Sequence, residues 1–403
     1  MLGVTVHPAL AAVPQETWDA AVPRGRGGLM HAFLTPCGSV LDEGQWRVFT
    51  VGEAGAYAPV AVSPGVIHRV DLSAWLPAAA GRAVALARRL NAGLLRPRVL
   101  ELGPPCWPGA PLACNQPALA GACAALVMEE AWRQVEAGHA DVLMVRDFGG
   151  ERTPTESWLD ATQFVKVAER PTFVASLGGR DLAGYVAAMR APYRRRAHQY
   201  LGADLTGGEA LRISVIAGEQ MRARADDIAR LCALTTERST ESRREQVGAE
   251  VMAGWAACRR ARVLLIEDRA GVLLLAAVVL LDPPVLHFIR VGFDETVGRQ
   301  TGVYPRLLYE LVRLAAAEGC EHVDLGLTSA DQKLRAGARP LPLRVWARHR
   351  NPVVQRLLRA AIPRLAGGPA ALDRNVFREP PPPVRPSWYG EVGPDDVQAR
   401  NGS

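Results

Sequence analysis

One histidine of the chain stands where its side chain could act as a general base. His287 lies in the apolar segment 285–289, and an imidazole can exchange a proton near neutral pH. Arg290 follows three residues later, and an odd spacing places two side chains on opposite faces of a regular strand. At most one of the two therefore points into a site. A histidine in so apolar a strand can instead be a hydrogen-bonded core residue, and the sequence leaves both interpretations open.

A second candidate group lies in the run D-L-G-L-T-S-A-D-Q-K-L-R-A-G-A at residues 324–338. Its Lys333 and the distant Lys166 are the only lysines of a chain that otherwise uses arginine. This isolation makes Lys333 a candidate for chemistry, with a solvated loop lysine as the alternative. Asp324 ends the predicted strand before the loop. Its carboxylate could orient Lys333 or a substrate amine, or it could cap the loop backbone.

Other kinds of chemistry have no support in the sequence. There is no G-x-S-x-G motif, which would indicate a covalent acyl-enzyme. There is also no C-x-x-C motif and no H-x-x-x-H pair, so we expect no metal site. The seven cysteines are odd in number, and several fall in apolar helical patterns. Reduced thiols in the core are therefore expected rather than a disulfide framework.

Length and composition indicate a globular chain of more than one domain. Its 403 residues exceed the roughly 150–250 that one core usually supports. No apolar run approaches the about 18–20 residues of a membrane-spanning helix, and the N-terminus lacks a basic leader. We therefore expect a cytoplasmic protein with no transmembrane segment.

The chain is basic, with a formal net charge of +6 and an isoelectric point near 9.1. A basic chain invites a nucleic-acid partner. However, an arginine-rich composition with abundant alanine and glycine also follows from a GC-rich genome. Local clusters of charged residues are therefore better indicators of a nucleic-acid partner than the net charge of the chain. We expect no DNA partner.

The two halves of the chain repeat the same order of elements. A predicted hairpin at 46–62 matches one at 263–281, because both pair β-rich segments around a glycine-containing turn. A helix at 118–136 runs into the strand 141–145, and a helix with Leu307, Leu308, Leu311 and Ala315 runs likewise into the strand 323–326. This repetition predicts a tandem duplication.

The predicted domains are 1–150, 151–366 and a Pro-rich extended tail at 367–403. Gly149 to Ser157 is rich in turn formers, which favours a boundary there. Further apolar periodicities predict helices near 182–189, 228–232 and 247–258.

Residues 160–350 resemble the FemAB-like branch of the Gcn5-related acyltransferase (GNAT) superfamily. The resemblance rests on several features: Ser176-Leu177 before a helix that leads to Arg194-Arg195-Arg196, the hairpin at 263–281, Tyr304-Pro305 opening a long helix, and the pattern Asp324, Gly326, Lys333 and Gly337. It implies a mixed-sheet α/β fold of two tandem GNAT-like domains, of which the second is better marked.

The resemblance also implies a reaction. An amine attacks an activated carbonyl held by coenzyme A or by the 3′ end of a charged tRNA, and the protein stabilises the tetrahedral oxyanion. In FemAB-like enzymes the lysine that Lys333 matches lies near the reacting carbonyl, where an ammonium stabilises negative charge. No tightly bound cofactor is implied. The acceptor is a small-molecule or peptide amine.

The sequence does not decide whether the acyl donor is an acyl-coenzyme A or a charged tRNA. Residues 299–304, R-Q-T-G-V-Y, stand where acyl-CoA enzymes carry R/Q-x-x-G-x-G/A, whose backbone amides cradle the pyrophosphate. Arg299 and Gly302 match this pattern. Tyr304 does not, and its ring is either a core residue or a proton donor.

Arg194 and Arg196 fall where FemAB-like relatives place basic residues near the acceptor or the nucleic-acid path. Three adjacent arginines cannot all face one way on a helix, so a solvated helix start is the alternative for some of them. The first hypothesis is an aminoacyl-tRNA-dependent aminoacyltransferase. The second is an acyl-CoA-dependent N-acyltransferase, and the third is a non-catalytic binding protein that keeps the fold.

Overall fold

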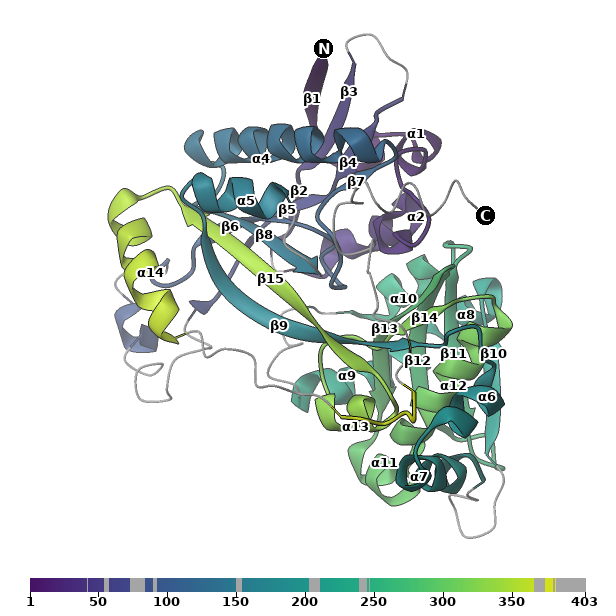
Figure 1. Cartoon of the computed structure of the whole chain (residues 1–403). Coiled ribbons are helices and arrows are strands. Elements are labelled where there is room, and N and C mark those ends of the chain that lie inside the picture. Colours follow the sequence, from purple (N-terminus) through teal and green to yellow (C-terminus); the bar gives the residue numbers. More distant parts are fainter. Residues whose placement is uncertain are drawn as a thin grey trace.

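The computed structural model describes residues 1–41, 43–53, 58–72, 84–89, 93–149, 154–202, 211–238, 247–365 and 374–379, together with positions 245 and 381. Two units are visible in Figure 1, joined by a sheet that runs through both. The predicted boundary near residue 150 falls outside the described residues, as does most of the predicted tail.

The first unit is built from short strands around one long helix. Its strands are β1 (Leu2–His7), β2 (Gln45–Trp46), β3 (Val48–Glu53), β4 (Ala61–Ser63), β5 (Gly65–Arg69), β6 (Arg98–Leu102), β7 (Ala113–Cys114) and β8 (Val142–Gly149). Its helices are α1 (Gln15–Asp19), α2 (His31–Leu34) and α4 (Ala120–Glu136), with 3-10 turns at Leu10–Ala12, Gly27–Leu29, Thr35–Ser39 and Pro117–Leu119.

The second half of the chain has longer strands with helices on both sides of the sheet, and its first helix packs against α4 of the first unit (Figure 1). Its strands are β9 (Val165–Ser176), β10 (Arg212–Ile216), β11 (Ala261–Glu267), β12 (Leu273–Asp282), β13 (Val285–Phe293), β14 (His322–Asp324) and β15 (Arg339–His349). Its helices are α5 (Pro154–Ala161), α6 (Leu182–Ala188), α7 (Ala191–Gly202), α8 (Gly218–Ala223), α9 (Ala225–Arg238), α10 (Ala249–Trp255), α11 (Glu295–Thr301), α12 (Val303–Ala317), α13 (Ala330–Arg335) and α14 (Pro352–Leu365).

Within the described residues, one sheet has the strand order β10-β11-β12-β13-β14-β9-β15-β8-β6-β5-β2, and a smaller sheet has the order β1-β3-β4-β7. The long strands β9 and β15 cross from one unit to the other (Figure 1). β15 pairs antiparallel with both β9 and β8. The second half thus supplies the strand that completes the sheet of the first.

The predicted repetition is confirmed by the topology. The unit β6–α4–β8 contains a parallel strand pair, and so does β13–α12–β14. The predicted hairpin at 263–281 is the antiparallel pair β11–β12. β3 and β4 also pair antiparallel, although part of their connection lies outside the described residues.

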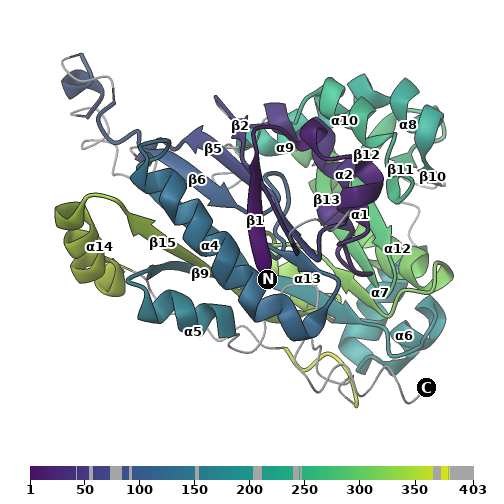
Figure 2. The same ribbon diagram turned by 90° about the horizontal axis from the view of Figure 1, so that it is seen from above.

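The central strands of the second unit are buried between two layers of helices. The residues of β12 from Leu275 to Leu280 are all fully buried, because helices cover both faces of this part of the sheet. One face packs against α6, α7 and α12. The other packs against α9, α10 and first-unit residues such as Phe33, and α4 covers the first unit's strands (Figure 2).

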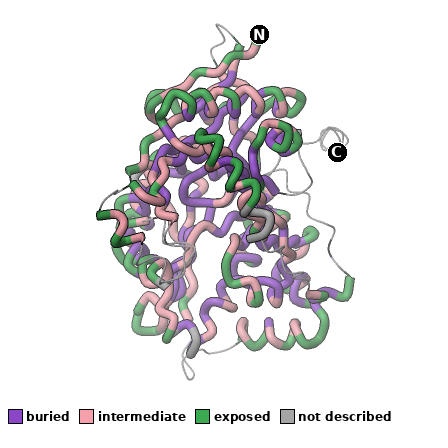
Figure 3. Tube along the Cα trace, turned by 90° about the vertical axis from the view of Figure 1, so that its left-hand side faces the viewer, coloured by how far each residue is buried: buried purple, intermediate pink, exposed green. Residues whose placement is uncertain are grey.

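Helix α12 has the predicted apolar face. Leu307, Leu308, Leu311 and Ala315 are all buried, and Gly319, with φ of +71°, follows the helix in the left-handed conformation that glycine adopts without strain. Figure 3 shows the same division across the molecule, with buried residues in the strands and exposed ones along the outer helices. Within the described part of the chain, no helix has the length and apolar character needed to cross a bilayer.

Candidate active site

The candidate site lies where β13 and β14 part. The two strands pair in parallel at only three positions, the last being His287 with Asp324. β13 then continues to Phe293, whereas β14 ends. The predicted strand at 323–326 is thus shorter than expected, because Asp324 turns the backbone into the following loop.

Asp324 holds that loop. Its Oδ1 accepts hydrogen bonds from the Thr172 hydroxyl at 2.6 Å and from the Gly326 amide at 3.0 Å. Its Oδ2 faces His287 Nδ1 at 3.5 Å. The capping role predicted for Asp324 is therefore present, and the same carboxylate also faces the candidate base.

His287 is enclosed by residues of the first unit. It is 0% exposed, and its Nε2 lies 3.2 Å from the Gly25 carbonyl oxygen. The Trp107 ring meets it edge-on at 4.6 Å between centroids. Nε2 thus faces an acceptor oxygen, whereas the buried Nδ1 forms no hydrogen bond with any described residue. In this conformation His287 is a core residue, the alternative that the sequence left open, and it is hydrogen-bonded through one nitrogen.

Lys333 is buried rather than solvated, which makes the loop-lysine alternative wrong. It lies on α13 with 1% exposure. Its Nζ donates to the Gly326 carbonyl at 2.9 Å and lies 5.7 Å from the centre of the Phe173 ring. Lysine is almost never this buried without partners, so the site is shaped to hold an ammonium group.

Tyr304 lies beside the same loop, at the start of α12. Its ring stacks on Phe293 at 5.6 Å. Burial raises the pKa of Tyr304 to about 12, against a smaller opposing effect of the hydrogen bond with Ser329. The phenol is therefore neutral near pH 7 and can act as a hydrogen-bond donor, and its packing agrees with a core role.

The segment expected to form a pyrophosphate loop is helical. In α11 the Gly298 amide donates to the Asp294 carbonyl at 2.7 Å, and the Gly302 amide donates to the Gly298 carbonyl at 3.0 Å. Gly302 has φ of +65° and begins α12. Pro305 contributes no N–H to the first turn. The side chain of Arg299 lies outside the described residues.

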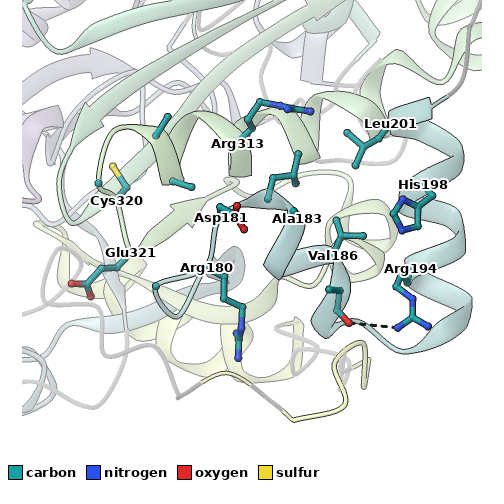
Figure 4. A pocket seen from close by; sticks show the side chains of 16 residues that line it. Arg180, Asp181, Ala183, Val186, Arg194, His198, Leu201, Arg313, Cys320 and Glu321 are labelled. Carbon is teal, nitrogen blue, oxygen red and sulfur yellow. Dashed lines mark hydrogen bonds between the residues drawn. The ribbon is translucent and has the colours of Figure 1, made fainter.

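The two arginines predicted to bind the donor point to different places. Arg194 Nη1 donates to the carbonyl oxygens of Met189 at 3.0 Å and Ala187 at 3.5 Å. It borders a pocket between α6, α7 and α12 rather than the parting strands (Figure 4).

Arg196 instead lies toward α13. The pKa of Asp331 is lowered chiefly by its hydrogen bond to Arg335, with smaller effects of Arg374 and Arg196. Asp331 pairs with Arg335 Nε at 2.6 Å and with Arg374 Nη2 at 2.5 Å. Tyr193 and Tyr200 also act electrostatically on Arg335. We call this group the α7–α13 basic surface, comprising Tyr193, Arg196, Tyr200, Arg335 and Arg374.

Sequence reasoning missed the first-unit residues that enclose His287. Trp107 stacks so closely on Gly28 that a Cβ there would lie 2.2 Å from its ring. The Gly27 amide donates to Asp282 Oδ2 at 2.5 Å. The glycine-rich run at 24–28 could have indicated a close contact, because glycine permits such close backbone approach. No feature of the sequence indicated that Trp107 would contact His287.

The corresponding place in the first unit holds a closed ion network. Arg146, just past the last β6–β8 pair, contacts Glu101 at 2.5 Å and Asp147 at 2.6 Å. Its Nη2 also donates to the Trp107 carbonyl at 3.2 Å. Glu101 pairs in turn with His68 at 2.9 Å. Charges satisfied in this way have structural partners, which is consistent with chemistry centred in the second unit.

Metal binding finds no geometric support in the described residues, where no group of three or more His, Cys, Asp or Glu side chains could hold an ion. All seven cysteines are buried and form no disulfide.

Comparison of the structure with solved structures finds FemX, with a TM-score of 0.54 and 12% identity over 86% of this chain and 98% of FemX. It also finds L-PGS from Bacillus licheniformis, with a TM-score of 0.51 and 11% identity over 87% of this chain and 97% of that one. No family model and no curated protein matches the sequence. At these identities the likeness establishes the fold: the chain has the FemAB-like tandem GNAT fold, as predicted.

Proposed function

We propose that the protein is an aminoacyltransferase that takes its acyl group from aminoacyl-tRNA and passes it to an amine acceptor in the cytoplasm. The acceptor nitrogen attacks the ester carbonyl and forms the new C–N bond. The C–O bond to the tRNA then breaks, and the 3′-hydroxyl leaves with the proton that the amine loses. The fold shared with FemX and L-PGS supports acyl transfer in general, but a shared fold does not fix the donor.

The observation that carries the choice of donor is helix α11. Within the segment 299–304, which matches the coenzyme A pattern, residues 299–301 belong to this helix, and the Gly302 amide donates to the Gly298 carbonyl at 3.0 Å. Pro305 removes one more donor, and the buried Tyr304 ring fills the place of a small residue. All three features weaken the cradle that a helix N-terminus otherwise offers to phosphates.

The α7–α13 basic surface supports the same choice. Arg196, Arg335 and Arg374 all act on the carboxylate of Asp331, and Tyr193 and Tyr200 act on Arg335. Arginines interleaved with aromatic rings suit a nucleic-acid strand, because the cations contact phosphates and the rings stack on bases. This surface adjoins the loop of Lys333, since Asp331 and Lys333 share α13.

The chemical roles follow from the contacts. Lys333 supplies the ammonium that stabilises the oxyanion. Asp324 acts as a positioning residue through the Gly326 amide. His287 remains the candidate base, and Tyr304 a candidate hydrogen-bond donor. Because Lys333 and His287 are almost fully buried, the loop at 325–329 must move before either can reach a substrate.

The test is a pair of titrations on the full chain. Calorimetry with acetyl-CoA and longer acyl-CoAs should show no binding, whereas filter binding with charged tRNA should show saturable binding that weakens with salt. Micromolar binding of an acyl-CoA would overturn the choice of donor in favour of acyl-CoA-dependent transfer. Binding of neither donor would leave the non-catalytic alternative.

A further inference from the structure

A pocket of about 870 Å³ lies between α6, α7 and the C-terminal half of α12 (Figure 4). Its lining includes Ala316 of α12 and Cys320, which precedes β14. Tyr304 lies at the other end of α12, ~18 Å away at 1.5 Å per residue. The pocket is therefore separate from the candidate active site.

The floor of the pocket is apolar and made of small side chains. Ala183, Val186 and Ala187 of α6 line it together with Ala316 and Ala317 of α12. Longer side chains at these positions would interdigitate and fill the space between the helices. Figure 4 shows Ala183 and Val186 beneath the open groove. A hydrocarbon chain of a ligand would lose its contact with water on this floor.

One edge of the pocket is cationic. Arg194, His198 and Leu201 line it from α7, and their spacing of four and three residues puts them on one helix face. His198 projects from α7 toward the groove in Figure 4. Among the described residues, the hydrogen bonds of Arg194 go only to the two backbone carbonyls of Met189 and Ala187. Its positive charge has no carboxylate partner there.

The lining also contains two carboxylates, of Asp181 and Glu321, and a third arginine, Arg313. Arg313 pairs with Glu310 at 2.9 Å, and Asp181 accepts a hydrogen bond from the Gly184 amide at 2.8 Å but keeps its charge. Arg180 forms no ion pair with the described residues, and its buried Nη1 has no hydrogen-bond partner. Glu321 is 70% exposed, so water screens its charge. The pocket thus joins an apolar floor to two arginines, Arg180 and Arg194, that form no ion pair within the described part of the chain.

We infer that this pocket binds a single-chain amphiphile with an anionic head group, a phosphate or a carboxylate. The alkyl or acyl chain lies on the alanine floor, and the head group pairs with Arg194 and His198, since a guanidinium donates paired hydrogen bonds to either anion. This binding site is independent of the proposed acyl transfer and would stand if that proposal failed.

Calorimetry on the full chain tests the inference, with decyl phosphate and decanoate as probes below their micelle-forming concentrations. Decyl phosphate should bind saturably at one site, and decanol and inorganic phosphate should each bind at least about tenfold more weakly, because each lacks one half of the recognised chemistry. Decanoate binding as tightly as decyl phosphate would extend the site to carboxylates, whereas weaker binding would restrict it to phosphates.

Variants locate the site. Ala183→Trp should abolish saturable binding by filling the groove, and it should fold normally because Ala183 is exposed. Arg194→Gln should weaken decyl phosphate binding about tenfold, whereas Arg195→Gln, its exposed neighbour outside the pocket lining, should not. The inference is overturned if no probe binds saturably, if decanol binds as tightly as decyl phosphate, or if the Ala183 and Arg194 variants bind like the unaltered protein.

Discussion

The carbonyl oxygen of Gly326 accepts a hydrogen bond from Lys333 Nζ at 2.9 Å. The amide of the same glycine donates to Asp324 at 3.0 Å, so one residue joins the carboxylate to the ammonium. Gly326 has φ of +73°, a conformation that lets both of its backbone groups serve these partners. The Asp-x-Gly and lysine pattern of the sequence is thus one connected structure.

Lys333→Ala should lower turnover by roughly a hundredfold, the contribution of one oxyanion donor. Single-turnover transfer from charged tRNA measures this effect. Lys166→Ala is the matched control, because Lys166 is the other lysine and lies exposed, paired only with Glu169 at 2.7 Å among the described residues. Equal rates for both variants would remove Lys333 from the mechanism.

Gly326→Ala should lower the free energy of unfolding by about 1–2 kcal/mol, because the left-handed conformation costs a residue with a side chain about this much. A Cβ at this position meets nothing closer than the Phe288 carbonyl at 3.5 Å, so the cost comes from the backbone rather than from a clash. Denaturant unfolding measures it. Gly202→Ala, at the end of α7 with open space around the Cβ, should be neutral or slightly stabilising.

Gly28→Ala should destabilise by several kcal/mol, because its Cβ would lie 2.2 Å from the Trp107 ring and the packed core would have to shift. Trp107→Leu in the same chain should recover part of the loss by making room. A double-mutant cycle of unfolding free energies checks this coupling. Additive effects would show that the two residues do not compete for the same space.

The raised pKa of Tyr304 predicts that the protein loses stability at high pH. Its folded pKa of about 12 exceeds the ordinary value of about 10. The neutral phenol therefore stabilises the fold fully below pH ~10, and this contribution of about 2–3 kcal/mol is lost as the pH rises through ~12. Tyr304→Phe should flatten the decline in unfolding free energy between about pH 10 and pH 12. An unchanged decline would assign it to other groups.

Arg196→Gln should weaken tRNA binding at every sequence and reduce the slope of log affinity against log salt by about 1, as one lost phosphate contact does. Filter binding at several salt concentrations measures the slope. Arg195→Gln is the control, since Arg195 lies about 100° further round α7 and is exposed. Loss of slope in both variants would indicate general charge attraction instead of a defined surface.

Local patterns predicted much of the fold. The apolar spacing of α12 was sufficient, because a buried helix face imposes its period on the sequence. For β11 and β12, the β-rich segments on either side of a glycine-containing turn were sufficient. The duplication followed from the order of those elements, whereas the mixed α/β sheet was implied by the family resemblance. The exact end of β14 did not, because the Asp324 side chain decides it.

The candidate site was only partly predictable. Asp324 at the end of β14 and Lys333 on α13 are joined through Gly326, within a short stretch of the chain that the sequence pattern had singled out. Trp107 and Gly25, by contrast, reach His287 from far away in the chain, and no periodicity reports such a contact. The helical state of residues 295–301 was missed for a different reason. The family pattern suggested a loop, and Arg299 has one glycine on either side of it, Gly298 and Gly302.

Strand β15 pairs with β8 of the first unit and with β9 of the second. This pairing couples the stability of one half of the chain to that of the other. Cutting the chain near residue 150 would strip β8 of its neighbour and leave a row of unsatisfied backbone groups at a new sheet edge. Neither piece should then be stable or resist aggregation alone. The intact chain should unfold in one cooperative transition. We therefore expect the two halves to fold as a single unit, neither being able to fold independently.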